Sequence, residues 1–487
     1  MFILTDNVKG RVSHLLLLFI LIYLVVFVKL NAFHMLWWDE SMFAVNTYEM
    51  MQNGDLFTPY FNGSPDLFNT KPPLTSWLQM IFVKWIGYNE LAMRLPSAIA
   101  ASLTVLVLFN FLAERAGISW AWFSVLILLT SPGFINFHTA RTGDSDALLT
   151  FLLLCANLYF MKYVLDEKPR HVFVLFLFLS LAFAAKMHAS LLFVPAYLIV
   201  LVKEKKLKTF VSSKYFVAGV FLFLISSSLI FLLREMHSPG YLSRVFFKDA
   251  GRIFSVVEGH KESLTFYLDN LFRSRFSIWV VILIPGILNA FTGEKSSEKK
   301  ILMTASVLVL SYFIMISLSV TKLEWYDMPL YPLLALITGQ MLLLFAGKFS
   351  PAITGMRIIM LAVLIFAYPY FISFNRSQAN SISAYNMNRQ AKEMYIFKSG
   401  IKNKNLDGIK VYYSGYNGSL LFYKYKLKDQ HQLIELSDNG NFKEKDKVLV
   451  SDDSLKSILR KKYDLVIIDS LDSAQLIEIK AALVAEK

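Results

Sequence analysis

Two adjacent acids, Asp39 and Glu40, follow the first long apolar run of the chain, which covers residues 14–33. A carboxylate in this position can act as a general base or orient an acceptor hydroxyl. It can equally stabilise the start of the next helix, because the helix dipole favours an acid at a helix N-terminus. The residue types leave both roles open.

Lys71 stands before two prolines, Pro72 and Pro73. Pro72 disfavours the α-helical region for Lys71, and the fixed φ angles of both prolines stiffen the chain that follows. A compact ammonium group on a stiff backbone suits a phosphate group. The alternative is an ordinary solvated lysine in a loop. Arg94 follows in the same polar segment, just before the next apolar run.

A third acid, Asp146, stands where a later apolar run begins, shortly after Arg141 and Asp144. An ionisable group at the mouth of a membrane span is costly to bury, so it is usually paired or functional. A helix N-cap is a compatible role for Asp146. Lys186 lies between two short apolar runs, and nothing obvious in the sequence neutralises its charge.

Lys322 and Tyr326 lie together between two other apolar runs. They fit interfacial anchors as well as ligands of a substrate. His260 is a weaker candidate, because a lone histidine is more often structural. The histidines are scattered without a spacing such as H-E-x-x-H, so we predict no metal site and no cofactor, although a metal requirement is not excluded.

The composition is that of a membrane protein: 55% of the residues are hydrophobic and 17% are charged. Its formal net charge of +13 does not require a nucleic-acid partner, and we predict none. Many lysines and arginines fall in short loops between apolar runs, where the preference for positive charge on the cytoplasmic side explains them. The single cysteine, Cys155, excludes an intramolecular disulfide.

The apolar runs predict a mainly α-helical, polytopic membrane protein with about eleven transmembrane helices. Each run approaches the roughly 20 residues that a crossing helix needs, although the pair beside Lys186 is short. The expected spans cover residues 14–33, 95–113, 119–137, 146–164, 171–187, 189–202, 215–233, 276–292, 301–320, 327–346 and 357–375.

The distribution of basic residues predicts that the N-terminus is cytoplasmic. Trp37 and Trp38 after the first run are typical of an interfacial aromatic belt, and no small-residue cleavage site follows that run, so we expect an uncleaved helix. An odd number of spans then puts both the polar segment 34–93 and the C-terminus on the outer side. All the candidate residues above fall on that face.

A change in composition near Arg376 divides the chain into a transmembrane domain, residues 1–375, and a small soluble α/β domain, residues 376–487. Short strands are expected at Ile409–Tyr413, Lys447–Val450 and Asp464–Ile468. Helical periodicity is expected at Ser454–Lys462 and again at Ser473–Ala485.

The motifs together resemble those of a known family. Asp39-Glu40, Asn53-Gly54-Asp55, Lys71-Pro72-Pro73-Leu74, Trp77 and Arg94-Leu95-Pro96 occur in the order typical of bacterial dolichyl-phosphate-mannose-protein-mannosyltransferase-like proteins. These are membrane glycosyltransferases of the GT-C fold, related in architecture to the aminoarabinose transferase that acts on lipid A. Arg141–Asp146 and Thr321–Pro329 are similar to two further elements of the family. The family's usual Lys-Gly is Lys186-Met187 here.

The resemblance implies a hexosyl- or pentosyltransferase that uses a polyprenyl-phosphate-linked sugar on the outer face of a bacterial inner membrane, with inversion. The acceptor is a hydroxyl or phosphate of lipid A, another glycan or a protein, and membrane lipids surround the chain. The implied catalytic residues are Asp39, Glu40 and Asp146, the implied phosphate-binding residues are Lys71, Arg94, Lys322 and Tyr326, and the secondary candidates are Arg141, Lys186, His260 and Phe68.

A polytopic lipid or solute transporter, or a flippase without transferase activity, is the alternative from another class. The sequence shows no repeat between its halves and no pair of spans broken by glycine or proline, which are the usual signs of a transporter. The polar candidates also gather at one face and not at mid-membrane. These observations favour the transferase.

Overall fold

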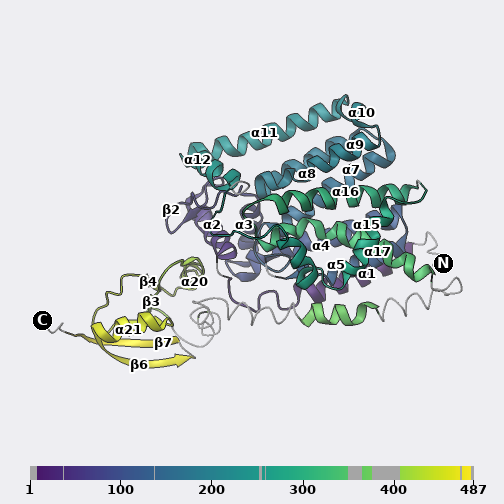
Figure 1. Ribbon diagram of the computed structural model, residues 1–487. Helices are drawn as coiled ribbons and strands as arrows, with labels where there is room; N and C mark the ends of the chain where they lie inside the picture. Colours follow the sequence, from purple (N-terminus) through teal and green to yellow (C-terminus); the bar gives the residue numbers. More distant parts are fainter. Residues whose placement is uncertain are drawn as a thin grey trace. The chain divides into compact units, whose positions relative to one another are not determined.

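The computed structural model describes residues 8–36, 38–136, 138–251, 255–257, 259–294, 296–348, 365–375, 397, 406–471 and 474–483. The chain is mainly helical and has a small sheet near its C-terminus (Figure 1). This confirms the predicted fold class in its coarse form. Trp37, one of the two tryptophans expected in the aromatic belt, lies outside the described residues.

Six helical segments among the described residues are long and apolar enough to cross a membrane. Each holds a window of at least 18 residues with few charges, close to the length that a bilayer requires. They are α4 (Glu90–Arg115), α7 (Asp146–Asp166), α8 with η2 (Arg170–Lys186 and Met187–Leu191), α11 (Lys214–His237), α16 (Ser297–Leu318), and η5 with α17 (Glu324–Leu330 and Tyr331–Lys348).

Four further apolar segments of the described chain are shorter. They coincide with predicted spans, and residues 365–375 of the last predicted span are helical too. The number of crossings, about eleven, stays a prediction. The four are α1 with η1 (Val8–Ile22 and Tyr23–Phe27), α5 (Ile118–Leu129), α9 (Val194–Lys203) and α15 (Trp279–Ala290).

The remaining helices of the membrane portion are short. They connect the long helices and include a series between α11 and α15. In Figure 1, α8 lies beside α7 and α11. The short helices are α6 (Pro132–Ile135), α10 (Leu207–Val211), α12 (Tyr241–Val245), η3 (Phe246–Ala250), α14 (Phe266–Asn270) and η4 (Leu271–Arg275).

Helices α5 and α17 approach each other closely at Gly339. A Cβ atom on Gly339 would lie 2.5 Å from Ser124 Oγ and 2.8 Å from the Ser124 backbone nitrogen, so only glycine fits. Nearby, Trp120 donates its indole N–H to the Leu336 carbonyl at 2.8 Å. Small residues at such contacts are typical of helix pairs in membranes, where close packing drives association.

The polar segment predicted at residues 34–93 contains α2 (Asp39–Asn53), the hairpin β1 (Tyr60–Phe61) and β2 (Ser64–Pro65), and α3 (Leu74–Ile86). Glu49 of α2 fixes the hairpin, because its carboxylate accepts the N–H groups of Asn62 and Gly63, both at 2.8 Å. Both turn residues have positive φ, which suits glycine and asparagine.

The C-terminal sheet has the strand order β4-β3-β5-β7-β6. Strand β3 is parallel to β4 and β5, whereas β7 is antiparallel to β5 and β6. Leu455 and Leu459 of α21 (Asp453–Lys462) pack on the sheet, and α20 follows β3 and comes before β4 in the chain (Figure 1). The remaining elements are α20 (Gly418–Lys428), β3 (Lys410–Tyr412), β4 (Glu435–Ser437), β5 (Lys447–Val450), β6 (Tyr463–Leu471) and β7 (Ala474–Ala482).

The predicted strands at 409–413, 447–450 and 464–468 and the helix at 454–462 are confirmed. The predicted helix at 473–485 is wrong where the structure describes it, because β7 occupies 474–482. Ile477 and Ile479 are both fully buried. Residues two positions apart point to the same face of a strand, so this burial pattern fits a strand. Helix α20 was not predicted.

The chain packs as two compact units. The first comprises Met1–Val28, Leu67–Thr75 and Pro96–Gln378, and the second comprises Lys29–Asp66, Ser76–Leu95 and Ala379–Lys487. Most of the polar segment 34–93 therefore packs with the C-terminal residues. The division at residue 375, which was drawn from composition, stays a prediction about domains.

Candidate active site

Asp146 and Lys186 form an ion pair in the first unit. The Lys186 ammonium donates a hydrogen bond of 2.5 Å to Asp146 Oδ1, and the two side chains are only 14% and 4% exposed. Asp146 is the first residue of α7, and Lys186 is the last residue of the neighbouring helix α8. The sequence offered no partner for Lys186, because the two residues are 40 positions apart.

Tyr326 and Lys71 extend this pair into a cluster. The Lys186 ammonium lies 4.9 Å from the centre of the Tyr326 ring, within the range of a cation–π contact. The Tyr312 hydroxyl donates to the Tyr326 carbonyl at 3.1 Å, which fixes the backbone of η5 there. Lys71 is close enough to Asp146 to interact with its charge. Lys186 is thus the direct partner of the buried carboxylate, and the charge of Lys71 acts on it more weakly.

The backbone that carries Lys71 is held by Arg234 and Tyr241. Arg234 donates from Nη1 to the Lys71 carbonyl at 2.6 Å and from Nη2 to the Asn69 carbonyl. The Tyr241 hydroxyl donates to the Thr70 carbonyl at 2.9 Å, and the Arg234 guanidinium packs over the Tyr241 ring. Sequence reasoning missed both residues. The signal in the sequence was the position of Arg234, at the end of an apolar run. In the structure its side chain is only 1% exposed.

Lys248 provides another cation beside the same segment. Its ammonium lies 3.2 Å from the centre of the Phe68 ring and donates to the Phe68 carbonyl at 2.9 Å. Phe68 itself is 43% exposed. The structure therefore gives the secondary candidate Phe68 a partner that the sequence did not indicate.

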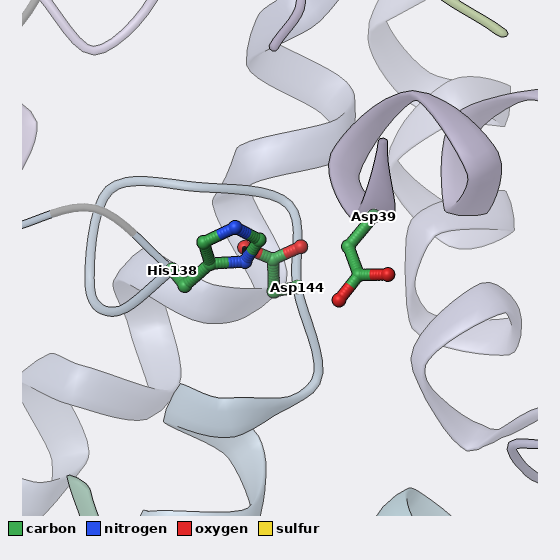
Figure 2. A group of neighbouring side chains, drawn as sticks. All are labelled: Asp39, His138 and Asp144. Carbon is green, nitrogen blue, oxygen red and sulfur yellow. Dashed lines mark ion pairs between the residues drawn. The ribbon is translucent and has the colours of Figure 1, made fainter. Parts of the chain in front are cut away.

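The loop between α6 and α7 is buried at almost every position that the structure describes. His138 Nδ1 lies 3.0 Å from Asp144 Oδ2 (Figure 2). The His138 ring also stacks on Trp325, with 3.7 Å between centroids. Ser97 of α4 donates to the Asp144 carbonyl at 2.7 Å. These contacts fix the chain that leads into Asp146.

Glu40 and Arg94 form a fully buried pair in the second unit. All five guanidinium N–H groups of Arg94 are used. Three of them donate to the backbone carbonyls of Leu30, Phe33 and His34, and two donate to Glu40 at 2.7 and 3.0 Å. Glu40 also accepts the Leu36 N–H at 2.8 Å. This arrangement fits a structural role for both residues, and the catalytic and phosphate-binding roles that the resemblance implied stay predictions.

Asp39 is the first residue of α2 (Figure 2), and it is partly exposed. It lies in the first turn, where the helix dipole stabilises a carboxylate. Its position therefore fits both roles left open by the sequence.

Lys322 and His260 belong to paired backbone segments. The Lys322 N–H donates to the His260 carbonyl at 3.1 Å, and the Lys322 ammonium donates to the carbonyls of Ser319 and Glu262 at 2.5 and 3.3 Å. Burial lowers the pKa of Lys322, while the charge of Glu262 acts in the opposite direction. The His260 side chain is exposed, and only its carbonyl takes part in this pairing.

Arg141 caps the end of the first helix. Its Nη1 donates to the carbonyls of Val25 and Val26, both at 2.9 Å, and its Nη2 donates to the Val28 carbonyl at 3.0 Å. The last carbonyls of a helix need such donors, and a cation there also complements the helix dipole. The observed contacts of Arg141 are therefore structural.

Comparison with known proteins gives consistent likenesses. The family model described as dolichyl-phosphate-mannose-protein mannosyltransferase matches residues 70–231. The putative mannosyltransferase YycA of Bacillus subtilis is 26% identical over 174 residues, which are 35% of this chain and 25% of the relative. The undecaprenyl phosphate-alpha-4-amino-4-deoxy-L-arabinose arabinosyl transferase 2 of Pseudomonas fluorescens is 26% identical over 324 residues, 64% of this chain and 53% of the relative.

The structure of ArnT from Cupriavidus metallidurans bound to undecaprenyl phosphate superposes with a TM-score of 0.74. It has 16% sequence identity, and the match covers 98% of this chain and 99% of that one. The chain is therefore similar to dolichyl-phosphate-mannose-protein mannosyltransferases (PMT) and to ArnT, and it has the GT-C fold of ArnT. The resemblance predicted from the motifs is confirmed. The PMT/ArnT-like chain is an integral membrane protein, as its apolar helices also indicate.

Proposed function

We propose that this PMT/ArnT-like chain is a glycosyltransferase that moves a sugar from a polyprenyl-phosphate donor to an acceptor hydroxyl or phosphate. The Pseudomonas fluorescens relative is named for an undecaprenyl-phosphate-linked sugar, and the ArnT structure contains undecaprenyl phosphate. The acceptor is lipid A, another glycan or a protein. The reaction takes place on the outer face of a bacterial inner membrane and inverts the anomeric carbon. The N-terminus lies in the cytoplasm, and the C-terminal domain lies outside.

One observation carries the proposal: Lys71 and Lys186 both act on the buried Asp146 carboxylate in a mainly helical membrane unit. A polyprenyl phosphate places an anion at the end of an apolar tail, so its binding site needs cations beside membrane helices. The Arg234 and Tyr241 contacts hold the Lys71 backbone in place before the donor binds. Preorganised cations of this kind stabilise a phosphate leaving group.

The reaction is a single displacement. The acceptor oxygen attacks the anomeric carbon, the bond from that carbon to the phosphate oxygen breaks, and the bonding pair leaves with the polyprenyl phosphate. Lys71 and Lys186 neutralise the charge that develops on the phosphate, with Tyr326 positioned beside Lys186. Attack from the side opposite to the leaving group inverts the anomeric centre. The acceptor proton passes to a carboxylate.

Asp39 is our choice for that carboxylate. Glu40 and Asp146 are each in an ion pair with a buried cation, at 2.7 and 2.5 Å. The hydrogen bonds to these cations occupy carboxylate oxygens that a base would need for the acceptor proton. We propose that these two acids hold Arg94 and Lys186 and that Asp39, a catalytic residue by the family resemblance, accepts the proton. Lys322 is assigned to the donor phosphate on the family resemblance alone.

The test uses purified protein in lipid nanodiscs and undecaprenyl phosphate that carries radiolabelled mannose or 4-amino-4-deoxy-L-arabinose. Wild-type protein should release undecaprenyl phosphate from one of these two sugar donors. It should also transfer the radiolabel to a lipid A, glycan or peptide acceptor. Lys71→Ala should weaken donor use by about tenfold to a hundredfold, the effect of losing one charge-assisted hydrogen bond of roughly 1.5–3 kcal/mol. Lys208→Ala, at an exposed lysine of the short helix α10, is the matched control.

Two results would contradict the proposal. One is the absence of donor cleavage with both sugars and all acceptors in protein that is folded and binds the donor. The other is a normal transfer rate for Lys71→Ala, which would remove Lys71 from the phosphate site. Movement of the intact donor across the bilayer without cleavage would favour the flippase alternative.

A further inference from the structure

The residue before Asp39 has an unusual backbone. Trp38 has φ 72° and ψ −116°, in a region that residues other than glycine rarely adopt. Its carbonyl belongs to the peptide group that joins it to Asp39, so the orientation of that peptide sets the direction in which α2 begins. A conformation of this kind persists only where the surrounding structure holds it.

Tyr416 holds this peptide within the second unit. Its hydroxyl donates to the Trp38 carbonyl at 3.2 Å, and Ser41 donates to the same carbonyl at 2.9 Å. The rings of Trp38 and Tyr416 lie 4.7 Å apart, and the Tyr416 ring also stacks on Phe61. Burial raises the pKa of Tyr416 and the charge of Asp39 adds to this effect, so the phenol stays protonated and can donate.

Gly418 explains why Tyr416 can come so close to α2. A Cβ atom on Gly418 would lie 2.8 Å from Ser41 Oγ and 2.4 Å from the Tyr416 hydroxyl. Any larger residue would therefore displace the Tyr416 ring or the Ser41 hydroxyl. The absence of a side chain at position 418 permits the contact that Tyr416 makes.

Helix α20 is anchored to the polar segment at several other points. The Tyr423 hydroxyl and the Lys426 ammonium donate to the two oxygens of Glu90, at 2.9 and 2.6 Å. The Tyr425 hydroxyl donates to Glu49, the residue that fixes the β1–β2 hairpin, at 2.5 Å. These bonds give Tyr416 a rigid base, because α20 begins two residues after it.

We propose that Tyr416 is a positioning residue for the catalytic carboxylate of Asp39, supplied by the C-terminal part of the chain. This inference rests on the proposed function. Tyr416 contacts neither donor nor acceptor in this scheme. It acts through the Trp38 carbonyl, which it keeps in the orientation that directs the Asp39 side chain toward the acceptor hydroxyl.

The decisive variant is Tyr416→Phe, which keeps the ring and removes the hydroxyl. Tyr413→Phe is the matched control, because the Tyr413 hydroxyl accepts one hydrogen bond from Asn417 in the same loop and has no such bond to α2. Single-turnover transfer is measured with the labelled donor already bound, together with the dissociation constant of undecaprenyl phosphate. Tyr416→Phe should slow transfer about tenfold without changing donor affinity, since small misplacements of a catalytic group have effects of this size or larger.

Hydrogen exchange over residues 36–45, followed by mass spectrometry, provides a readout that does not depend on turnover. Exchange at the start of α2 should be faster in Tyr416→Phe and unchanged in Tyr413→Phe. Normal transfer and normal exchange in Tyr416→Phe, with an active wild type, would overturn the positioning role alone. An equal loss of transfer rate in Tyr416→Phe and Tyr413→Phe would also overturn the positioning role, because general destabilisation would then explain both losses. A wild type that cleaves no donor would overturn the proposed function and this inference with it.

Discussion

The guanidinium of Arg94 binds the carboxylate of Glu40 through two hydrogen bonds, although the two residues are 54 positions apart in the sequence. Neither side chain is more than 1% exposed. The pair joins the start of α4 to the start of α2, and the Arg94 bonds to three carbonyls extend the connection to residues 30–34.

Removal of Arg94 should strongly destabilise the protein. Breaking a buried ion pair by removing one partner costs about 3–5 kcal/mol, because a charge is left buried without compensation. Arg115 at the other end of α4 is the control: its pair with Asp166 is 32% and 17% exposed, so Arg115→Ala should cost about 1 kcal/mol or less. Urea unfolding of both variants in detergent measures the difference. Equal losses of unfolding free energy would show that the Arg94 pair contributes nothing beyond a surface pair.

Arg234→Lys should raise the KM for the donor about tenfold with a small effect on folding. Lysine keeps the charge but lacks the planar fork that donates to the carbonyls of Lys71 and Asn69. The Lys71 ammonium would then be less well placed for the phosphate. Arg244→Lys, at an exposed residue of α12, should leave the KM unchanged. A donor KM that does not respond to Arg234→Lys would show that the contacts of Arg234 with the Lys71 and Asn69 carbonyls do not affect donor binding.

Asp39→Asn should abolish most sugar transfer, by about 10²–10⁴-fold, because it keeps the shape of the side chain and removes its basicity. Donor affinity and unfolding free energy should stay near the wild-type values. Asp146→Asn should instead lower stability as well, because it leaves the Lys186 charge without its carboxylate. Single-turnover transfer and urea unfolding are compared for the two variants. Near-normal transfer by Asp39→Asn, with Asp146→Asn inactive, would move the base to Asp146.

Lys322 should make unfolding depend on pH in the alkaline range. Burial lowers its pKa below the ordinary value of 10.5, so between the two values the unfolded chain binds the proton and the folded chain does not. The free energy of unfolding of the wild type relative to Lys322→Met should therefore increase as pH rises through the lowered pKa, and level off near 10.5. A difference that decreases over the same range would mean that Lys322 gains a stabilising charge partner on folding.

The proposed orientation can be tested by cysteine labelling. With Cys155→Ser as the background, Ser64→Cys in β2 and Ser457→Cys in α21 should react with a membrane-impermeant maleimide added outside intact cells. Ser212→Cys, in the lysine-rich loop before α11, should react only after the membrane is opened. All three serines are exposed, so access to solvent is matched. Labelling of Ser212→Cys from outside would reverse the orientation.

The sequence predicted those features that depend on local composition. Long apolar runs predicted the membrane helices, and short apolar runs predicted β3, β5 and β6, because both signals lie within one element. Helix α20 was missed because its aromatic and basic residues have no apolar stripe that indicates a helix. Strand β7 was mistaken for a helix, since Leu476, Ile477 and Ile479 fit either period until their pairing partners are known.

Individual candidate residues were found from sequence, but their partners were not. The types and positions of Glu40, Arg94, Asp146 and Lys186 all indicated importance. Each of these residues is paired across at least 40 positions, and a pairing across such a distance leaves no local pattern in a single sequence. The family resemblance therefore implied catalytic and phosphate-binding roles for Glu40 and Arg94 without any sign of the buried contacts that the structure shows between them.

Helix α5 has a consequence for how the protein meets the lipid. Its twelve residues extend about 18 Å, well short of the roughly 30 Å of hydrocarbon in a bilayer. The chain that continues from it, with His138 and Asp144, is non-helical for much of its length yet buried. Irregular backbone at membrane depth is tolerated only where protein or enclosed water solvates it. The helices around this loop must therefore provide the polar contacts that hydrocarbon cannot. A change of bilayer thickness would alter the structure of the loop only if it first deformed those helices.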